Sequence, residues 1–123
     1  MELARMKRTK MALLALTLLA AAGVSRSSQA ACGGAQPYVI CGDVQVTLLY
    51  IEAGGNAYIR VDGNPESMPC ALNGGFITLP GSAAKFNAVY ATLLSAQATG
   101  RRVSIRMGPE AQCTVAYVTV AAQ

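Results

Sequence analysis

The stretch 82-SAAKFNAVYATLLSAQATGRRVSIRM-107 decides the fold, because it predicts a helix followed by a strand. Apolar side chains recur along its first part at the spacing of one buried helix face, at Phe86, Tyr90, Leu93, Leu94 and Ala98. The Ser82 hydroxyl is expected to cap the start of the helix, and Gly100 to end it in the left-handed conformation. A helix with one apolar face is buried against another element, so the rest of the chain should form a sheet.

Beyond Gly100, apolar and polar side chains alternate with a period of two residues, which is typical of a half-buried strand. The apolar positions are Val103, Ile105 and Met107, and the polar positions are Arg102, Ser104 and Arg106. We expect the polar row to face solvent, where its two guanidinium groups could bind an anionic sugar or a partner carboxylate through forked hydrogen bonds. The alternative is that these charges only protect an exposed strand from unwanted pairing.

Residues 1–30 have the three parts of a secretory signal peptide. A basic head precedes the apolar run 11-MALLALTLLAAAG-23, and small residues follow at Ser28 and Ala30. The apolar run is shorter than the roughly 20 residues that a membrane-spanning helix needs. We therefore expect cleavage between Ala30 and Ala31, no membrane span, and a mature protein that is periplasmic or secreted.

The formal net charge of +4 belongs to the predicted leader. Residues 1–30 hold five basic residues and one acidic residue, which is five minus one, or +4. The mature part balances five against five, namely Arg60, Lys85, Arg101, Arg102 and Arg106 against Asp43, Glu52, Asp62, Glu66 and Glu110. A nucleic-acid partner needs a net basic surface, so we expect no nucleic-acid binding.

All four cysteines, Cys32, Cys41, Cys70 and Cys113, follow the predicted cleavage site. Residues 31–123 are enough for one domain, and an even number of cysteines in a small exported domain predicts disulfides. Four cysteines allow three pairings. A Cys32–Cys41 bond would close a short loop. The rival for Cys32 is lipidation, which would leave Cys41 without a partner.

The mature chain is expected to be mainly β with one helix. Strands are predicted at 43–52, 57–62, 76–79, 103–107 and 112–120, and the glycine-rich segment 31–42 is expected to be irregular. The helix falls between the third and fourth strands. This order is that of the OB-fold, a small, partly open five-stranded barrel. Other five-stranded folds with one helix share it, because element order does not determine topology.

Several motifs resemble the family of subtilase-cytotoxin B subunits and related short exported bacterial proteins. They are 61-VDG-63, Asn64-Pro65 with Cys70, 90-YATLLSA-96 and Thr99-Gly100, within a resemblance that covers about residues 42–120. The resemblance implies an OB-fold, a ring-shaped pentamer, glycan binding and a Cys70–Cys113 disulfide. At the position of the family's sugar-binding serine this chain has Cys41, which cannot offer the same hydroxyl group.

The composition argues against catalysis and against a metal centre. There is no histidine, so Ser-His and Cys-His nucleophiles are excluded, and no two cysteines have the spacing of a zinc site. The carboxylates of Asp62 and Glu66 flank a loop, where solvated acids are the common case. We expect no enzyme activity and no cofactor.

The expected function is therefore a non-catalytic binding module for a glycan or a protein. Its candidate ligand-binding residues are Arg102, Ser104 and Arg106, together with Tyr58, which is expected to be exposed and able to stack on a sugar ring. A toxin-like module would be a pentamer. The alternative is a structural or accessory envelope protein with no small-molecule ligand.

Overall fold

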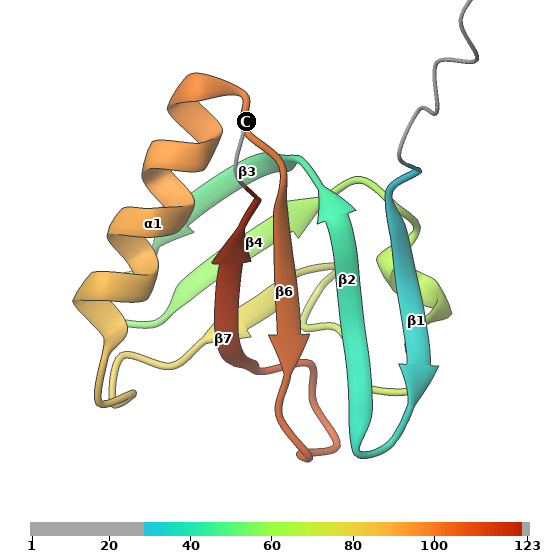
Figure 1. Ribbon diagram of the computed structural model, residues 1–123. Helices are drawn as coiled ribbons and strands as arrows, with labels where there is room; N and C mark the ends of the chain where they lie inside the picture. The colour runs from blue at the N-terminus through green and yellow to red at the C-terminus, as the bar shows by residue number, and fades with distance from the viewer. Residues whose placement is uncertain (1–28, 122–123) are drawn as a thin grey trace, which may run out of the picture.

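The computed structural model describes residues 29–121, so nearly all of the predicted signal peptide lies outside the described residues. Within these residues the fold consists of two antiparallel sheets, one α-helix and a short 3-10 helix, η2 (Pro65–Ser67), which confirms that this part of the chain is mainly β with a single α-helix (Figure 1). One sheet has the strand order β1-β2-β6-β7, with strands Ala31–Ala35, Tyr38–Val44, Val103–Met107 and Val115–Val120. The other has the order β3-β4-β5, with strands Val46–Ile51, Ala57–Val61 and Ile77–Leu79.

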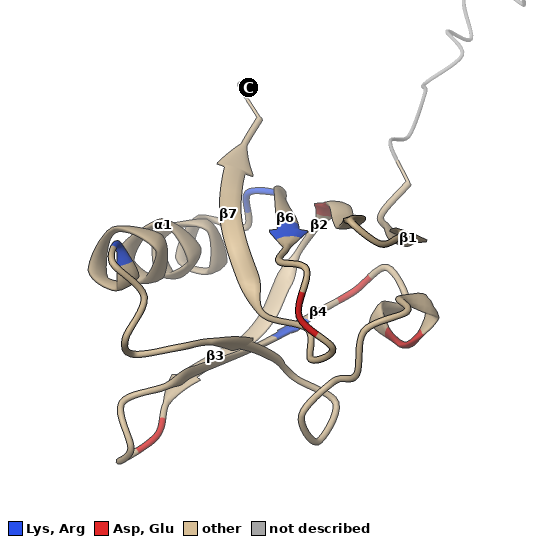
Figure 2. Ribbon diagram, turned by 90° about the horizontal axis from the view of Figure 1, so that it is seen from below, with Lys and Arg blue, Asp and Glu red and all other residues tan. Residues whose placement is uncertain are grey.

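The two sheets form layers with the apolar core between them, and helix α1 (Phe86–Thr99) lies beside β7 and β3 (Figure 2). The largest fully buried side chains come from both layers and from the helix; they include Val39, Val44, Ile59, Ile77, Leu79, Leu93, Val103, Ile105 and Met107. A backbone hydrogen bond also connects the two layers. The N–H of Thr78, on β5, donates to the carbonyl of Cys113, just before β7, over 2.9 Å. Within residues 29–121 the sheets do not close into the expected five-stranded barrel.

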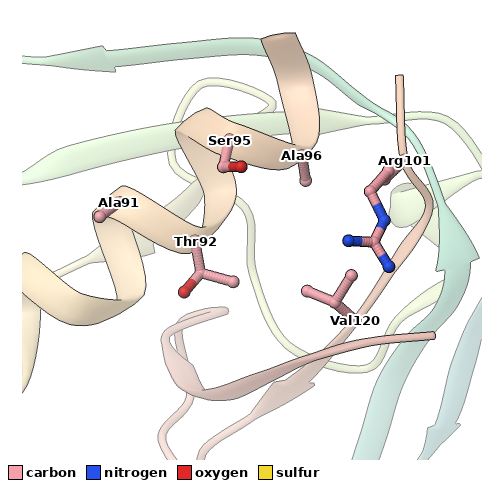
Figure 3. A pocket seen from close by; sticks show the side chains of 6 residues that line it. All are labelled: Ala91, Thr92, Ser95, Ala96, Arg101 and Val120. Atoms are coloured by element: carbon pink, nitrogen blue, oxygen red, sulfur yellow. The ribbon is translucent and has the colours of Figure 1, made fainter. Parts of the chain in front are cut away.

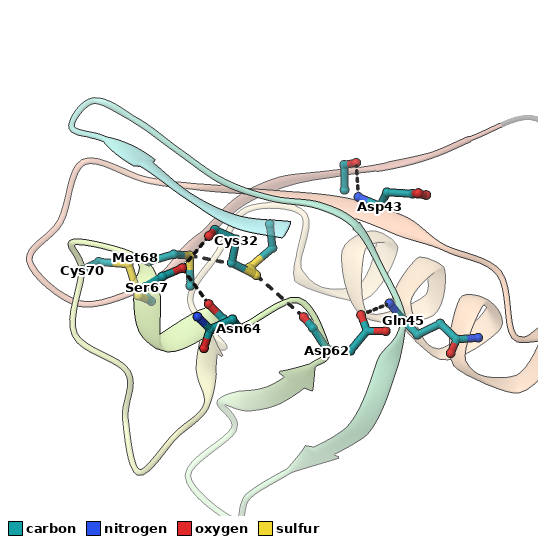
Figure 4. Close-up of a disulfide and its surroundings, with 11 residues drawn as sticks. Cys32, Asp43, Gln45, Asp62, Asn64, Ser67, Met68 and Cys70 are labelled. Carbon is teal, nitrogen blue, oxygen red and sulfur yellow. Dashed lines mark hydrogen bonds between the residues drawn. A yellow bond between two sulfur atoms is a disulfide. The ribbon is translucent and has the colours of Figure 1, made fainter. Parts of the chain in front are cut away.

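The segment 31–42 is not irregular, as its glycines suggested, but forms the hairpin of β1 with most of β2. Cys32 lies directly opposite Cys41 in the register of this hairpin, and the two are joined by a disulfide. The Ser67 Oγ lies 2.6 Å from the Cys32 carbonyl oxygen and 2.8 Å from that of Asn64 (Figure 4). The hairpin is thus attached to a distant loop, and these long-range bonds are what the local composition did not indicate.

The long strand predicted at 43–52 is interrupted at Gln45, where β2 ends and β3 begins, and the backbone bends just before this break, at Asp43. This residue has a φ of 54°, in the left-handed region that aspartate tolerates better than most residues. The β2–β6 register shifts between Cys41 and Val44, which marks a bulge at the same place. The bend lets one continuous stretch serve both sheets, so that Val44 and Val46 are both buried although the chain changes layer between them.

Helix α1 begins later than predicted and buries a narrower face. Its N-cap is Lys85, with no capping hydrogen bond from a side chain, so the expected Ser82 cap is wrong. Gly100 ends the helix with a φ of 68° and donates its N–H to Ala96, as expected of a left-handed cap. Leu93 is fully buried, whereas Leu94 is 46% exposed and lies outside the buried face. Adjacent helical residues are about 100° apart, so a buried face as narrow as the one that holds Leu93 and Ala96 leaves Leu94 outside it.

Strand β6 confirms the predicted alternation. Val103, Ile105 and Met107 are buried, while the intervening side chains lie on the outer face and are half-buried rather than fully in solvent.

The second disulfide joins Cys70 and Cys113, as the family resemblance implied. It lies beside the backbone bonds that connect the segment before β5 to the segment before β7.

Candidate functional site

The structure brings Arg102 and Ser104 together, but both side chains bind the backbone of the bend at Asp43. Arg102 Nη1 donates a hydrogen bond to the Asp43 carbonyl over 2.8 Å and lies 3.9 Å from Asp62 Oδ2. The N–H of Asp43 donates to Ser104 Oγ over 3.1 Å. Gln45 N–H donates to Asp62 Oδ1 over 2.8 Å on the other side of the bend (Figure 4). These polar groups hold the chain where it passes from one sheet to the other, so they are not a free ligand-binding row.

Arg102→Ala is therefore expected to destabilise the protein, contrary to what a solvent-facing arginine would show. It removes a charge-assisted hydrogen bond and an ion pair, but both partners of the ion pair are 39% exposed, so we expect a loss of about 1 kcal/mol in the free energy of unfolding. Urea denaturation measures the change. Arg106→Ala removes the same charge from β6, the strand that Arg102 directly precedes, and should cost clearly less; equal losses would contradict the role of Arg102 at the bend.

Arg106 lies apart from that bend. Its guanidinium carbon is 4.7 Å from the centre of the Tyr38 ring, and Nη2 donates to the Pro37 carbonyl over 3.3 Å. Stacking on the ring orients the cation without neutralising it. Of the predicted polar row, Arg106 is the residue that still presents a cation on the outer face of the sheet.

Tyr58 is on the other sheet and is not exposed, so the prediction of an exposed stacking ring at this position is wrong. It is only 8% exposed because Tyr50 and Phe76 pack against it, with ring centres 5.3 Å and 6.3 Å away. The Tyr50 and Phe76 rings are 5.5 Å apart and perpendicular. Tyr50, at 41% exposed, is the most accessible of the three rings, and Phe76 is half-buried. In the observed hairpin Tyr50 and Tyr58 are each four residues from Gly54, whereas the turn predicted at 53–56 would have placed Tyr50 opposite Ile59, one residue further along.

One cation and one carboxylate lie next to these rings. The Arg60 guanidinium carbon is 4.4 Å from the centre of the Phe76 ring, and Glu52 Oε1 accepts a hydrogen bond from the Tyr58 hydroxyl over 3.1 Å. Both charged residues are exposed. We call this surface, made of Tyr50, Tyr58, Phe76, Arg60 and Glu52, the aromatic face. It combines an apolar platform with a group that only donates hydrogen bonds and a group that only accepts them.

A shallow pocket of about 320 Å³ lies between α1 and the end of β7 (Figure 3). Its lining is Ala91, Thr92, Ser95, Ala96, Arg101 and Val120. Arg101 Nη2 donates to the Ala121 carbonyl over 2.8 Å, and Thr92 Oγ1 donates to the Ala88 carbonyl over 2.9 Å. Two of its polar side chains therefore already bind the protein's own backbone. The pocket is a weaker candidate site than the aromatic face.

Among residues 29–121 no three His, Cys, Asp or Glu side chains are grouped closely enough to hold a metal ion. In the same part of the chain no helix is long and apolar enough to cross a membrane. All four cysteines are joined in disulfides, so none of them offers a thiol.

No family model matches this chain, and no curated protein or solved structure matches it either. The likeness to subtilase-cytotoxin B subunits thus remains a prediction from the motifs quoted above. The site has to be argued from its own chemistry.

Proposed function

We propose that this protein is an exported, non-catalytic binding module that recognises a glycan through the aromatic face. The observation that carries the proposal is the combination of an accessible Tyr50 ring with Arg60 and Glu52 on one open sheet surface. A sugar ring has an apolar C–H face that packs on an aromatic ring, and hydroxyl groups that both donate and accept hydrogen bonds. Arg60 supplies hydrogen-bond donors and Glu52 supplies acceptors for these hydroxyl groups.

An OB-like arrangement is part of this proposal, and the strand pairing supports it. If β2 and β3 count as one bent strand, that strand pairs with β4 on one side and with β6 on the other. Strand β4 then pairs with β5, β6 pairs with β7, and β5 meets the segment leading into β7 through a parallel bridge. In OB-folds the face of the second and third strands binds oligosaccharides and oligonucleotides. Here Tyr58 lies on the strand in the second position, and Phe76 directly precedes the third.

The proposal predicts that Tyr50→Ala abolishes or strongly weakens glycan binding. Losing one stacked ring should raise the Kd at least about tenfold, because a buried aromatic face contributes 1.4 kcal/mol or more. The test is a glycan array followed by calorimetry on the best sugar. Tyr117→Ala is the matched control, since Tyr117 is similarly exposed but lies on the four-stranded sheet.

Binding that is equal in Tyr50→Ala and the wild type, or no binding to any glycan, would overturn this proposal. The second outcome would favour a structural or accessory envelope protein, in which the aromatic face only covers the sheet. A toxin-like module would in addition be a ring-shaped pentamer, which light scattering on the mature protein decides. A monomer removes the toxin-like form and leaves a monomeric glycan-binding module.

A further inference from the structure

The outer face of the four-stranded sheet carries a second group of large exposed side chains. Ile40, Arg106 and Tyr117 lie directly opposite one another on the neighbouring strands β2, β6 and β7. Tyr38 is also on β2, two residues before Ile40, and its ring packs against the Arg106 guanidinium. Tyr38 is 68%, Tyr117 50% and Ile40 39% exposed. We call these four residues the four-stranded face; their strands lie in front in Figure 1.

The neighbouring strand, β1, has only small side chains on this face. On the same face, β1 presents Ala31, Gly33 and Ala35, which are opposite Gly42, Ile40 and Tyr38. The surface is therefore a ridge of large side chains with a flat shelf beside it, and not a concave pocket. Small molecules are bound mainly in concave pockets that enclose most of their surface. A flat surface rich in tyrosine, arginine and isoleucine is instead the composition of a protein contact.

The electrostatics of this face specify the partner. Within the described residues the one ion pair is between Arg102 and Asp62, and Arg106 has no carboxylate within 4.0 Å. Its guanidinium has five N–H donors and uses one of them, on the Pro37 carbonyl. The four residues of the face and the β1 shelf beside them include no acidic side chain. A carboxylate from another molecule would bind the free N–H donors of the Arg106 guanidinium through two charge-assisted hydrogen bonds.

We propose that the four-stranded face docks an acidic peptide segment of a partner protein. An Asp or Glu carboxylate of that segment binds Arg106, and neighbouring apolar side chains pack on Ile40, Tyr38 and Tyr117. A second copy of the chain fits poorly, because a two-fold contact through this face would oppose Arg106 to its own copy without a compensating acid.

The size of the face sets the strength of this contact. Four strands and five residues per strand span about 14 Å by 14 Å, from the usual strand spacing and rise. That area is well below the roughly 800 Å² that each partner buries in a stable complex. The occupant is therefore a short segment or loop, bound reversibly. The two faces belong to different sheets, so a glycan and a peptide could be held at the same time.

The experiment is selection of a random peptide library, displayed on phage, on the immobilised mature protein. We expect the selected peptides to share an Asp or Glu flanked by apolar residues, and their affinity to fall with added salt. Synthetic copies of these peptides should bind Arg106→Gln at least about tenfold more weakly than the wild type, because a hydrogen bond to a charged group contributes that much. Tyr117→Ala should weaken binding by a similar factor, because it removes a large apolar contact. Arg106→Lys should retain part of the affinity, since lysine keeps the charge but not the fork.

Tyr50→Ala is the matched control and should bind the peptides like the wild type, so failure of this inference is distinguishable from failure of glycan binding. Thermal unfolding of each variant shows whether it is folded. Selection without acidic residues, no selection at all, or equal binding by folded Arg106→Gln would overturn the proposal. So would a dimer in sedimentation that Tyr117→Arg dissociates, because a second copy would then occupy the face.

Discussion

Cys113→Ser is expected to lower the free energy of unfolding by about 4 kcal/mol, against about 2.5 kcal/mol for Cys32→Ser. The reason is the length of chain that each disulfide closes. Cys70 and Cys113 are 43 residues apart, whereas Cys32 and Cys41 are 9 apart. In the chain-entropy account a bond that closes a longer loop removes more conformations from the unfolded state and so stabilises the folded state more.

The two substitutions are a matched pair because burial is alike at both bonds. Cys113 is 1% exposed and Cys32 is 8% exposed, so each serine replaces a buried sulfur and the desolvation costs largely cancel in the comparison. A loss of about 4 kcal/mol is a large fraction of the free energy of unfolding of a typical domain, which is roughly 5–15 kcal/mol. Urea denaturation of the oxidised proteins, followed by circular dichroism, measures both values. An equal or larger loss for Cys32→Ser would contradict the loop-length argument.

Leu93→Ala is expected to cost about 3 kcal/mol of folding stability, while Leu94→Ala costs less than about 0.5 kcal/mol. Leu93 is fully buried between the helix and the sheets, so truncation leaves a cavity in addition to the lost apolar burial. Leu94 is 46% exposed, and its truncation is offset by the high helix propensity of alanine.

These neighbours provide an internal control, because both variants remove the same atoms from the same helix. The measurement is thermal or urea denaturation of the two variants beside the wild type. Similar losses would mean that α1 lies in a different rotation about its axis. A larger loss for Leu94→Ala would mean that Leu94, and not Leu93, packs on the core.

The aromatic face could be foreseen only in part. The predicted turn at 53–56 indicates that β3 and β4 form a hairpin, but it would place Tyr50 opposite Ile59; the observed hairpin is centred on Gly54 and pairs Tyr50 with Tyr58. Arg60 shares a face with Tyr58 because the two are two residues apart on β4, but Phe76 reaches the same surface only through the pairing of β4 with β5, which joins segments separated by a long loop. Whether Tyr58 is exposed depends on that pairing, because the Phe76 ring is one of the two that cover it. The predicted exposure failed for this reason.

The sequence by itself determined the features that are set by short-range chemistry. The helix followed by a strand across 82–107, the left-handed Gly100 and the alternation along β6 all depend on residues a few positions apart, where steric limits and side-chain periodicity act directly. The even number of cysteines likewise indicated two disulfides before the fold was known.

Only the tertiary structure decided where distant segments meet. The Asp43 bend is held by Arg102 and Ser104, about 60 positions further along the chain, and the same contacts remove two members of the expected ligand-binding row. The choice of Leu93 over Leu94 depends on which helix face the sheets cover. Burial and hydrogen-bond partners are properties of neighbours in space, and for these residues the neighbours come from elements that no local pattern specifies.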